Sequence, residues 1–266
     1  MAKVFLAQPC YGPIEFESCD AIEQAIGEGS PHEFTPVRMS SSLLANCFNK
    51  LLVTCLEAGG FDYWFMVHAD VGPTPLAADI MIAELEAYHL DVIHAPCKLK
   101  DGSGRTSTAV AYSDDPWDFK RRLTVKELAR LWPTFTAGTL AEQLDPGIKV
   151  LLPNTGCMLI KLGPWLDNFP GFEIRDRIDR VPVTRLGVTL SRDANTISED
   201  WNFGYWCAAN GVKVGGTFKV RTDHVGRAVY STKRITGLPF DDSYFELTGK
   251  TPPAETAVAD AGADAA

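Results

Sequence analysis

Short apolar runs alternate with helically spaced apolar residues through the first hundred positions of the chain. Residues 3–8 (KVFLAQ) predict a buried first strand that ends at Pro9, because proline lacks the backbone donor that a central strand uses. Between residues 40 and 56 apolar side chains recur every three or four positions, which predicts a helix closed by Gly59. Residues 63–67 (YWFMV) are apolar without interruption, as is typical of a central strand covered on both faces.

The same alternation continues to about residue 96. A proline-bounded turn at residues 72–75 leads into a predicted helix that reaches residue 88, and residues 91–96 (DVIHAP) predict another buried strand. The resulting order is strand, helix, strand, helix, strand. It favours an α/β fold in which helices cover both faces of a mostly parallel central sheet.

Beyond residue 98 the pattern becomes more polar. Residues 98–115 predict Gly-containing loops and residues 120–131 an exposed charged helix, which together are typical of a lid or substrate loop. Strand character returns at residues 156–162 and around residues 218–220, and a helix with acids in its first turn is predicted at residues 200–210. The tail at residues 249–266 has almost nothing large to bury, so it is predicted to be disordered.

Composition and charge limit the class of protein. The 266 residues are 45% hydrophobic and 22% charged, which is ordinary for a globular domain with a buried core. Neither a membrane span nor a secretory leader is recognisable, so we expect a soluble cytoplasmic protein. The formal net charge of −9 argues against a surface built as a whole for nucleic acid, although a local basic groove stays open. The seven cysteines form no CxxC or CxxH pair, which indicates reduced core thiols.

The most specific chemical signal is the triplet His68-Ala69-Asp70, which directly follows the apolar strand at residues 63–67. Open α/β sheets bind ligands just beyond the carboxyl ends of their strands. Side chains two apart on an extended segment point the same way, so the His68 imidazole and the Asp70 carboxylate can converge on one cation. The alternative is a strand-end acid that caps the following turn.

Two further motifs carry candidate chemistry. Glu199 and Asp200 stand at the start of the last predicted helix, where one acid can serve as a general base, although helix capping alone also places acids there. His224, within residues 222–226 (TDHVG), is either a metal ligand or a turn residue. The metal-ligand interpretation requires His224 and Asp70 to meet in space.

Taken in order, these motifs resemble the nucleotide-sugar-dependent glycosyltransferases of the GT-A fold. In that family a first strand ends in a loop at the nucleotide, matched here by Pro9-Cys10-Tyr11-Gly12, and the Asp-x-Asp metal motif corresponds to His68-Ala69-Asp70. The acceptor-side x-Glu-Asp motif corresponds to Ser198-Glu199-Asp200, and the C-terminal metal-binding histidine to His224. The likeness spans residues 3 to about 230, and segments such as FMVHADVGP and SEDWNF resemble small glycosyltransferase-like proteins common in bacteria and their phages.

The resemblance implies one GT-A domain at residues 1–248, with a nucleotide-binding half at about 1–100 and an acceptor half at about 150–230. It implies a metal-dependent enzyme that moves a sugar from a nucleotide diphosphate sugar, such as a UDP-sugar or GDP-sugar, to an acceptor hydroxyl with inversion. Asp70 and His224 would hold Mn²⁺ or Mg²⁺ against the departing diphosphate.

The resemblance also assigns roles to single residues. Asp200 would be the general base, and Glu199 would orient the acceptor. His68 departs from the family pattern, in which the first acid of the metal motif more often contacts the sugar or ribose, and this departure puts the choice of sugar in doubt.

Several further residues are candidates for contacts with the substrates. Expected at the nucleotide are Pro9 and Tyr11, with Asn46 or Asn49 at base or ribose edges; Arg105 is expected at phosphate or sugar hydroxyls, and Asn154, Thr155 and Gly156 at the donor sugar or the acceptor. Each set also has a structural interpretation. The two helix asparagines would be solvated, the arginine would lie in a wet loop, and the Asn-Thr-Gly segment would be an ordinary turn.

A saccharide is the expected acceptor. Hydroxymethylated phage DNA is the second candidate, for which Lys120, Arg121 and Arg122 offer a modest basic cluster that the overall acidity opposes. Two other classes stay open. One is a non-catalytic nucleotide-sugar or glycan-binding module, which the two carboxylates at 199 and 200 disfavour. The other is a sugar-phosphate nucleotidyltransferase, which would need a cationic phosphate loop where this chain has PCYGP.

Overall fold

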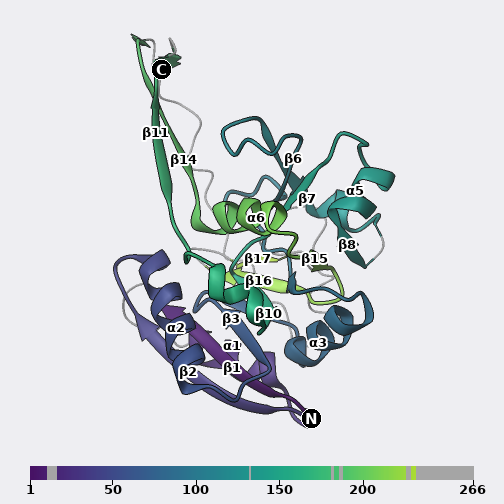
Figure 1. Cartoon of the computed structure of the whole chain (residues 1–266). Coiled ribbons are helices and arrows are strands. Elements are labelled where there is room, and N and C mark those ends of the chain that lie inside the picture. Colours follow the sequence, from purple (N-terminus) through teal and green to yellow (C-terminus); the bar gives the residue numbers. More distant parts are fainter. Residues whose placement is uncertain (11–16, 132, 181–182, 186–187, 226–228, 232–266) are drawn as a thin grey trace, which may run out of the picture.

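The core of the molecule is a central sheet with helices on both faces (Figure 1). The computed structural model describes residues 1–10, 17–131, 133–180, 183–185, 188–225 and 229–231. Within these residues the sheet strands are, in spatial order, β2 (Glu33–Ser40), β1 (Lys3–Cys10), β3 (Tyr63–Val67), β10 (Cys157–Lys161), β5 (Val92–His94), β15 (Val214–Thr217) and β8 (Thr134–Thr136). Only β10 and β8 of these run against the others, so the sheet is mostly parallel, as predicted.

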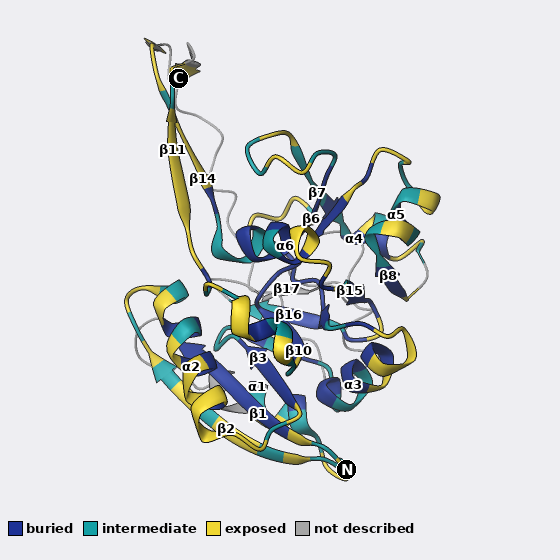
Figure 2. Cartoon of the chain, viewed as in Figure 1, coloured by how far each residue is buried: buried dark blue, intermediate teal, exposed yellow. Residues whose placement is uncertain are grey.

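Strand side chains alternate between two apolar layers. On one face, Phe65 of β3 packs in the cluster that contains α1 (Glu17–Ile26) and α3 (Ala77–Ala87). On the other face, Trp64 and Met66 pack with α2 (Leu44–Ala58) and α6 (Glu199–Ala209). β3 and β5 are accordingly buried along their whole length, and β1 and β10 are buried except at Lys3 and Lys161 (Figure 2). An α/β fold with two helical layers is therefore the architecture of the described chain.

Smaller sheets are attached to this core. β6 (Arg105–Ala111) lies between β7 (Lys120–Thr124) and β9 (Val150–Leu152), and α4 (Val125–Leu128) and α5 (Ala137–Gln143) pack beside them. β16 (Thr222–Val225) pairs with β4 (Val71–Pro73) and β17 (Val229–Ser231). A ribbon of β11 (Arg175–Asp179) and β14 (Asp193–Ile197), with β12 (Val183–Arg185) and β13 (Val188–Leu190) paired further along the chain, projects from the body after the 3₁₀ helix Pro164–Asn168 (Figure 1).

The predicted exposed helix at residues 120–131 is wrong. Residues 120–124 form β7, and a helix begins only after Thr124, whose side chain and that of Glu127 form a capping box. Leu123 and Leu128 are buried in a cluster of their own, so the region is a small packed unit and not a polar lid. The Lys-Arg-Arg run reads as a helical surface in the sequence, but pairing with β6 overrides that preference.

Other predicted boundaries also change. β1 continues through Pro9 to Cys10, because the Pro9 carbonyl is still usable on this strand although its nitrogen donates nothing. Residues 105–111, expected as loop, form β6, and residues 218–220 lie between β15 and β16 and are not a strand. The predicted strands at 63–67 and 156–162 and the helix at 200–210 are confirmed, with shifts of one residue at some ends.

The remaining expectations are either confirmed or concern residues that the structure does not describe. Buried thiols, as predicted, are Cys10, Cys47, Cys55, Cys97, Cys157 and Cys207. Tyr11 and the tail at residues 249–266 lie outside the described residues. Among the helices that are described, none has the length and apolar character needed to cross a bilayer.

Close packing of α6 on β9 predicts a sensitive glycine. A Cβ at Gly204 would lie 2.7 Å from Cδ of Pro153 and 3.3 Å from the Leu151 carbonyl oxygen, so Gly204→Ala should push the helix outward and destabilise the protein by about 1–3 kcal/mol. Urea unfolding measures the change. The matched control is Gly138→Ala in α5, whose Cβ would meet only Thr136 Oγ1, at 3.7 Å. Equal stability of the two variants would contradict the packing.

Candidate functional site

The segment after β3 is fixed by backbone hydrogen bonds from its two neighbouring strands. The His68 N–H donates to the Gly156 carbonyl just before β10 (2.9 Å), and the Ala69 N–H donates to the Pro9 carbonyl in β1 (3.3 Å). These bonds hold His68 and Asp70 at the carboxyl end of the central strands, which is where open α/β sheets bind ligands.

His224 reaches the same place from the C-terminal half of the chain. β16 pairs antiparallel with β4 so that His224 stands opposite Val71, and the Val225 N–H donates to the Asp70 carbonyl (2.8 Å). Nε2 of His224 then lies 3.4 Å from Oδ2 of Asp70. The structure therefore brings together the two residues that the metal-ligand interpretation requires to meet.

The other ring nitrogen of His224 fixes the chemistry of the pair. Nδ1 lies 2.7 Å from the backbone oxygen of Lys98, and because a carbonyl only accepts, Nδ1 must carry a proton. Nε2 is then the nitrogen that faces Asp70: it donates to the carboxylate when the ring carries a proton on both nitrogens, and it presents a lone pair when the ring is neutral. Two facing lone pairs are stabilised by a cation that both can bind, and metal-binding histidines are commonly fixed by a carbonyl on the second nitrogen in this way.

A lysine ammonium already lies on this carboxylate. Nζ of Lys100 is 2.6 Å from Oδ2 of Asp70, the same oxygen that faces His224. Burial by itself raises the pKa of the Asp70 carboxyl, but the hydrogen bonds and charges of His224 and Lys100 outweigh burial and hold that pKa well below its ordinary range. Asp70 is therefore ionised at neutral pH and attracts cations.

His68 adds a neutral imidazole to this corner. Its ring packs against Phe48, with centroids 5.1 Å apart, and burial lowers the pKa of His68 to about 4. Its buried Nε2 has no hydrogen-bond partner among the described residues, which is unusual for a buried nitrogen. An uncharged ring with an available nitrogen is a ligand type that divalent transition metals accept.

The residues present fit a divalent ion that is only partly enclosed by protein. In the described part of the chain no three His, Cys, Asp or Glu side chains converge as a complete metal site, and Asp70 and His224 form a pair. Two protein ligands are too few for a structural zinc, which is enclosed by four. Mg²⁺ and Mn²⁺ commonly take only one or two protein ligands and complete their coordination with phosphate oxygens and water.

The Asn154-Thr155-Gly156 segment packs next to the site and is hydrogen-bonded to His68. Asn154 and Thr155 are buried, and Nδ2 of Asn154 donates to the Ala95 carbonyl (2.9 Å). A Cβ at Gly156 would lie 2.9 Å from Sγ of Cys97, so glycine is needed where this segment passes Cys97. The buried Oδ1 of Asn154 has no hydrogen-bond partner among the described residues, and the segment meets the site through the bond from His68 to the Gly156 carbonyl.

Two residues predicted on the nucleotide side have internal partners. Each end of the Asn49 amide makes one hydrogen bond to the backbone of Phe172, at 2.9 and 2.7 Å, so Asn49 anchors a loop. Arg105 binds Asp101 at 3.1 Å and Ser103 within its own loop. The neighbouring Asn46 is exposed on α2, where a ligand can reach it.

The acidic pair at the start of α6 has a distinct environment. Oδ1 of Asp200 accepts from the hydroxyl of the N-cap residue Ser198 and from the Trp201 N–H (2.7 Å), so the carboxylate satisfies one free backbone donor in the first turn of α6. Burial, assisted by the charge of Glu199, raises the pKa of Asp200 to about 7, although the bonds from Ser198 and Trp201 and the charge of Arg122 oppose that rise. Burial also raises the pKa of Glu199. A carboxyl poised near neutrality suits a general base.

One loop connects the two clusters. Lys98 and Thr106 form an antiparallel bridge that closes the loop. On the incoming side of the loop, the Lys98 carbonyl accepts a hydrogen bond from Nδ1 of His224. On the outgoing side, the Ser107 carbonyl accepts from the Trp201 indole (3.2 Å) and from Arg122 (3.1 Å), whose guanidinium stacks 4.5 Å from the Trp201 ring. Residues 98–107 thus connect the cation corner, formed by His68, Asp70, Lys100 and His224, to the start of α6.

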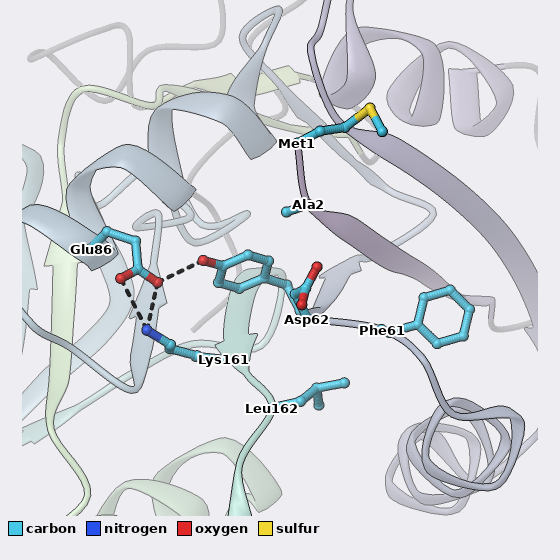
Figure 3. Close-up of a pocket in the computed structure, with 8 residues that line it drawn as sticks. Met1, Ala2, Phe61, Asp62, Glu86, Lys161 and Leu162 are labelled. Carbon is cyan, nitrogen blue, oxygen red and sulfur yellow. Dashed lines mark hydrogen bonds and ion pairs between the residues drawn. The ribbon is translucent and has the colours of Figure 1, made fainter.

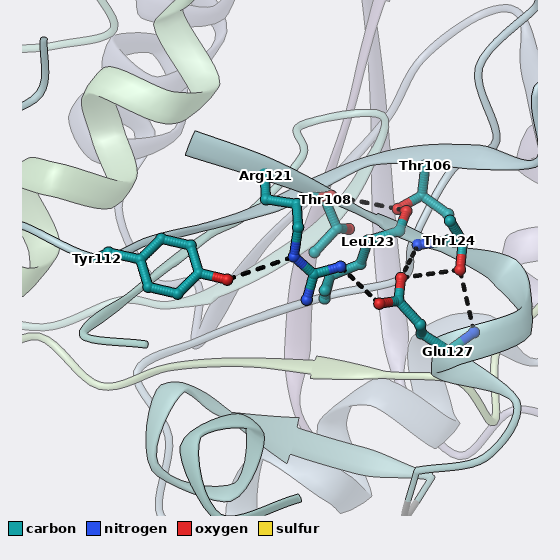
Figure 4. Close-up of polar contacts among 7 residues, drawn as sticks. All are labelled: Thr106, Thr108, Tyr112, Arg121, Leu123, Thr124 and Glu127. Carbon is teal, nitrogen blue, oxygen red and sulfur yellow. Dashed lines mark hydrogen bonds and ion pairs between the residues drawn. The ribbon is translucent and has the colours of Figure 1, made fainter. Parts of the chain in front are cut away.

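The basic run 120–122 is not a free patch. Arg121 is held between Glu127 (2.5 Å) and the Tyr112 hydroxyl (3.3 Å), as Figure 4 shows. Lys120 donates to the carbonyls of Pro116 and Asp118, and Arg122 donates to backbone carbonyls and stacks on Trp201. The cluster expected to attract DNA is therefore largely engaged in internal contacts.

Sequence reasoning did not identify Lys100 and Arg122 as site residues. Residues 98–108 contain several hydrogen-bond donors, and the sequence does not distinguish which of them contacts Asp70. In the structure, with Lys98 paired to Thr106, it is Lys100. Arg122 was read as part of an exposed helix, so its approach to α6 was not visible. A strand assignment for residues 105–111 would have been the one signal that places both.

A hollow at the opposite end of β3 has different chemistry. It is lined by Met1, Ala2, Phe61, Asp62, Tyr63, Glu86, Lys161 and Leu162. Glu86 accepts there from the ammonium of Lys161 (2.7 Å), as Figure 3 shows, and from the Tyr63 hydroxyl (2.6 Å). These charges satisfy one another, and β3 begins here and ends at the cation corner, so this hollow is separate from the candidate site.

Comparison with known proteins gives the fold and no family. No protein-family model and no curated protein matches the sequence. Among solved structures, the chain is similar to the crystal structure of A197 from STIV, with a TM-score of 0.50 and 14% sequence identity over 88% of this chain and 92% of that chain. At this identity the likeness supports a shared α/β fold only.

The environment of Asp200 predicts a pH-dependent stability. Because its pKa is raised to about 7, the folded state keeps a proton that the unfolded chain releases above about pH 4, so stability falls as the pH rises from about 4 to 7. Asp200→Asn cannot ionise. Between pH 4 and 8 its free energy of unfolding should rise relative to wild type by roughly 2–4 kcal/mol, measured by urea unfolding.

The control for this titration is Asp167→Asn, which removes an exposed carboxylate and should keep the wild-type slope. Parallel pH profiles for Asp200→Asn and wild type would show that the carboxyl is not held protonated by burial.

Proposed function

We propose that this protein is a metal-dependent glycosyltransferase of the GT-A fold, which moves a sugar from a nucleotide diphosphate sugar to an acceptor hydroxyl with inversion. The observation that carries the proposal is the approach of His224 to Asp70 at the carboxyl end of β3. The carboxyl of Asp200 at the start of α6, whose pKa burial raises to about 7, supports it. The α/β likeness to A197 from STIV is compatible with it and adds no function.

Asp70 and His224 would hold the divalent ion, Mn²⁺ or Mg²⁺, through Oδ2 and Nε2. When bound, such an ion offsets the negative charge that develops on a departing diphosphate. The Lys98 carbonyl keeps the His224 ring in the tautomer that leaves Nε2 available. His68, neutral and beside Asp70, would contact the ion or the donor sugar.

Asp200 would accept the proton from the acceptor hydroxyl. Both of the hydrogen bonds it accepts end on Oδ1, so we assign the proton to Oδ2. As that proton moves, the acceptor oxygen bonds to the anomeric carbon while the bond from that carbon to the diphosphate oxygen breaks, and the diphosphate leaves with the electron pair. Glu199 would orient the acceptor.

A saccharide remains the favoured acceptor. A net charge of −9 and the internal contacts of residues 120–122 leave little to attract DNA phosphates. Salt-dependent binding to duplex DNA in a gel-shift titration would revive hydroxymethylated DNA as the acceptor.

Donor binding should require metal. In thermal-shift measurements with UDP, GDP and their sugars, we expect stabilisation by at least one nucleotide with Mn²⁺ present and none after EDTA, equivalent to about 2.7 kcal/mol at a hundredfold excess over the dissociation constant. Asp70→Ala should abolish it, because the carboxylate that holds the ion is removed. Undiminished nucleotide binding by Asp70→Ala would contradict the proposal, and binding without donor hydrolysis would favour a non-catalytic module.

We expect catalysis to require Asp200 and donor binding not to require it. Asp200→Asn should lower kcat for donor turnover by roughly 10²–10⁴-fold, the range for loss of a general base, while metal-dependent nucleotide binding is retained. Asp167→Asn, on the exposed 3₁₀ helix, serves as control and should turn over at the wild-type rate. Full activity of Asp200→Asn would remove Asp200 from the proposed mechanism.

A further inference from the structure

Lys100 lies on the carboxylate oxygen that the proposed metal would bind. Its Nζ is 2.6 Å from Oδ2 of Asp70, and Nε2 of His224 faces the same oxygen at 3.4 Å. The ammonium therefore lies on the carboxylate oxygen that a shared cation would have to bind. A divalent ion and an ammonium repel each other, so both cannot bind this oxygen closely.

The loop that carries Lys100 is hydrogen-bonded to the cation corner. The Leu99 N–H donates to the Arg105 carbonyl (2.9 Å), and Gly102 and Gly104, both with positive φ, turn the chain between them. Two residues before Lys100, the Lys98 carbonyl accepts from Nδ1 of His224. The loop thus orients one candidate ligand and neutralises the other.

Within this loop, Lys100 is the cation that contacts Asp70. Its side chain is about one third exposed (33%), and a lysine has a flexible stem with three donors, so its ammonium can move to a neighbouring anion. Arg105, although more exposed (54%), pairs with Asp101 and Ser103 of its own loop and not with Asp70. An ammonium released from Asp70 would need a new anion, and the diphosphate of the donor supplies one next to the metal.

We propose that Lys100 is an exchangeable counter-ion, which neutralises Asp70 until a divalent ion and a diphosphate arrive together and then transfers its ammonium from Asp70 to the diphosphate. The inference rests on the proposed function. Metal alone would displace Lys100 without giving it a partner, and diphosphate alone would meet a carboxylate. Each ligand therefore strengthens the binding of the other, and by linkage the effect is reciprocal.

Mn²⁺ binding measured by electron paramagnetic resonance tests this coupling, since the signal of free Mn²⁺ falls as the ion binds. Wild type, Lys100→Gln and Lys161→Gln are titrated with MnCl₂ alone and with UDP or GDP, against matched titrations without protein. Lys161 is the matched control because it is a partly exposed lysine that pairs with Glu86 at 2.7 Å, at the other end of β3 (Figure 3). Circular dichroism and thermal melts confirm that each variant is folded.

In wild type and Lys161→Gln, nucleotide should tighten Mn²⁺ binding at least tenfold. Lys100→Gln should bind Mn²⁺ alone at least tenfold more tightly than wild type, yet bind nucleotide more weakly in the presence of Mn²⁺. These opposite shifts are not expected if Lys100 only stiffens its loop.

The outcomes separate this inference from the proposed function. Nucleotide-dependent Mn²⁺ binding that is identical in wild type and Lys100→Gln overturns the counter-ion role and leaves the metal-dependent transferase standing. Absence of Mn²⁺ binding to every variant, with either nucleotide, overturns both.

Discussion

The contact on which the site depends is the approach of the His224 imidazole to the Asp70 carboxylate. A carbonyl holds one proton of His224 on the far nitrogen, so Nε2 faces the carboxylate, and in the neutral ring it turns a lone pair toward that anion. Such a pair repels unless a cation or a proton lies beside it. In the described structure the Lys100 ammonium meets that need, and the corner is therefore a cation site by its electrostatics, whatever the identity of the cation.

Most of the surrounding fold serves to hold that contact. β4 and β16 pair in a register that sets His224 opposite the residue after Asp70, and β1 and the Gly156 carbonyl fix the chain on the other side. The loop at residues 98–107 then extends the same support to the start of α6 through the Ser107 carbonyl. The one loop therefore contacts both the residues around Asp70 and the start of α6.

Sequence reasoning succeeded where a single period or motif dominates. The uninterrupted apolar run at residues 63–67 predicts the central strand, and the GT-A resemblance requires His224 and Asp70 to meet, as they do. It failed where tertiary contacts override local preference. Residues 120–124 look helical but pair with β6, and Asn49 looks solvated but binds the backbone of Phe172. Lys100 could not be chosen among its neighbours, because strand register across a Gly-rich loop is not encoded in composition.

The two acids of the site are driven in opposite directions by their surroundings. Cationic neighbours hold the pKa of Asp70 below its ordinary range, whereas burial and the charge of Glu199 raise that of Asp200 to about 7. A carboxylate that stays ionised suits a ligand for a cation, and one that titrates near neutrality suits proton transfer. Structural capping explains the hydrogen bonds of Asp200 but gives no reason for burying it beside a second acid, since an exposed aspartate would cap α6 at a smaller desolvation cost. This separation of roles is the physical argument that favours chemistry over a purely structural use of residues 199 and 200.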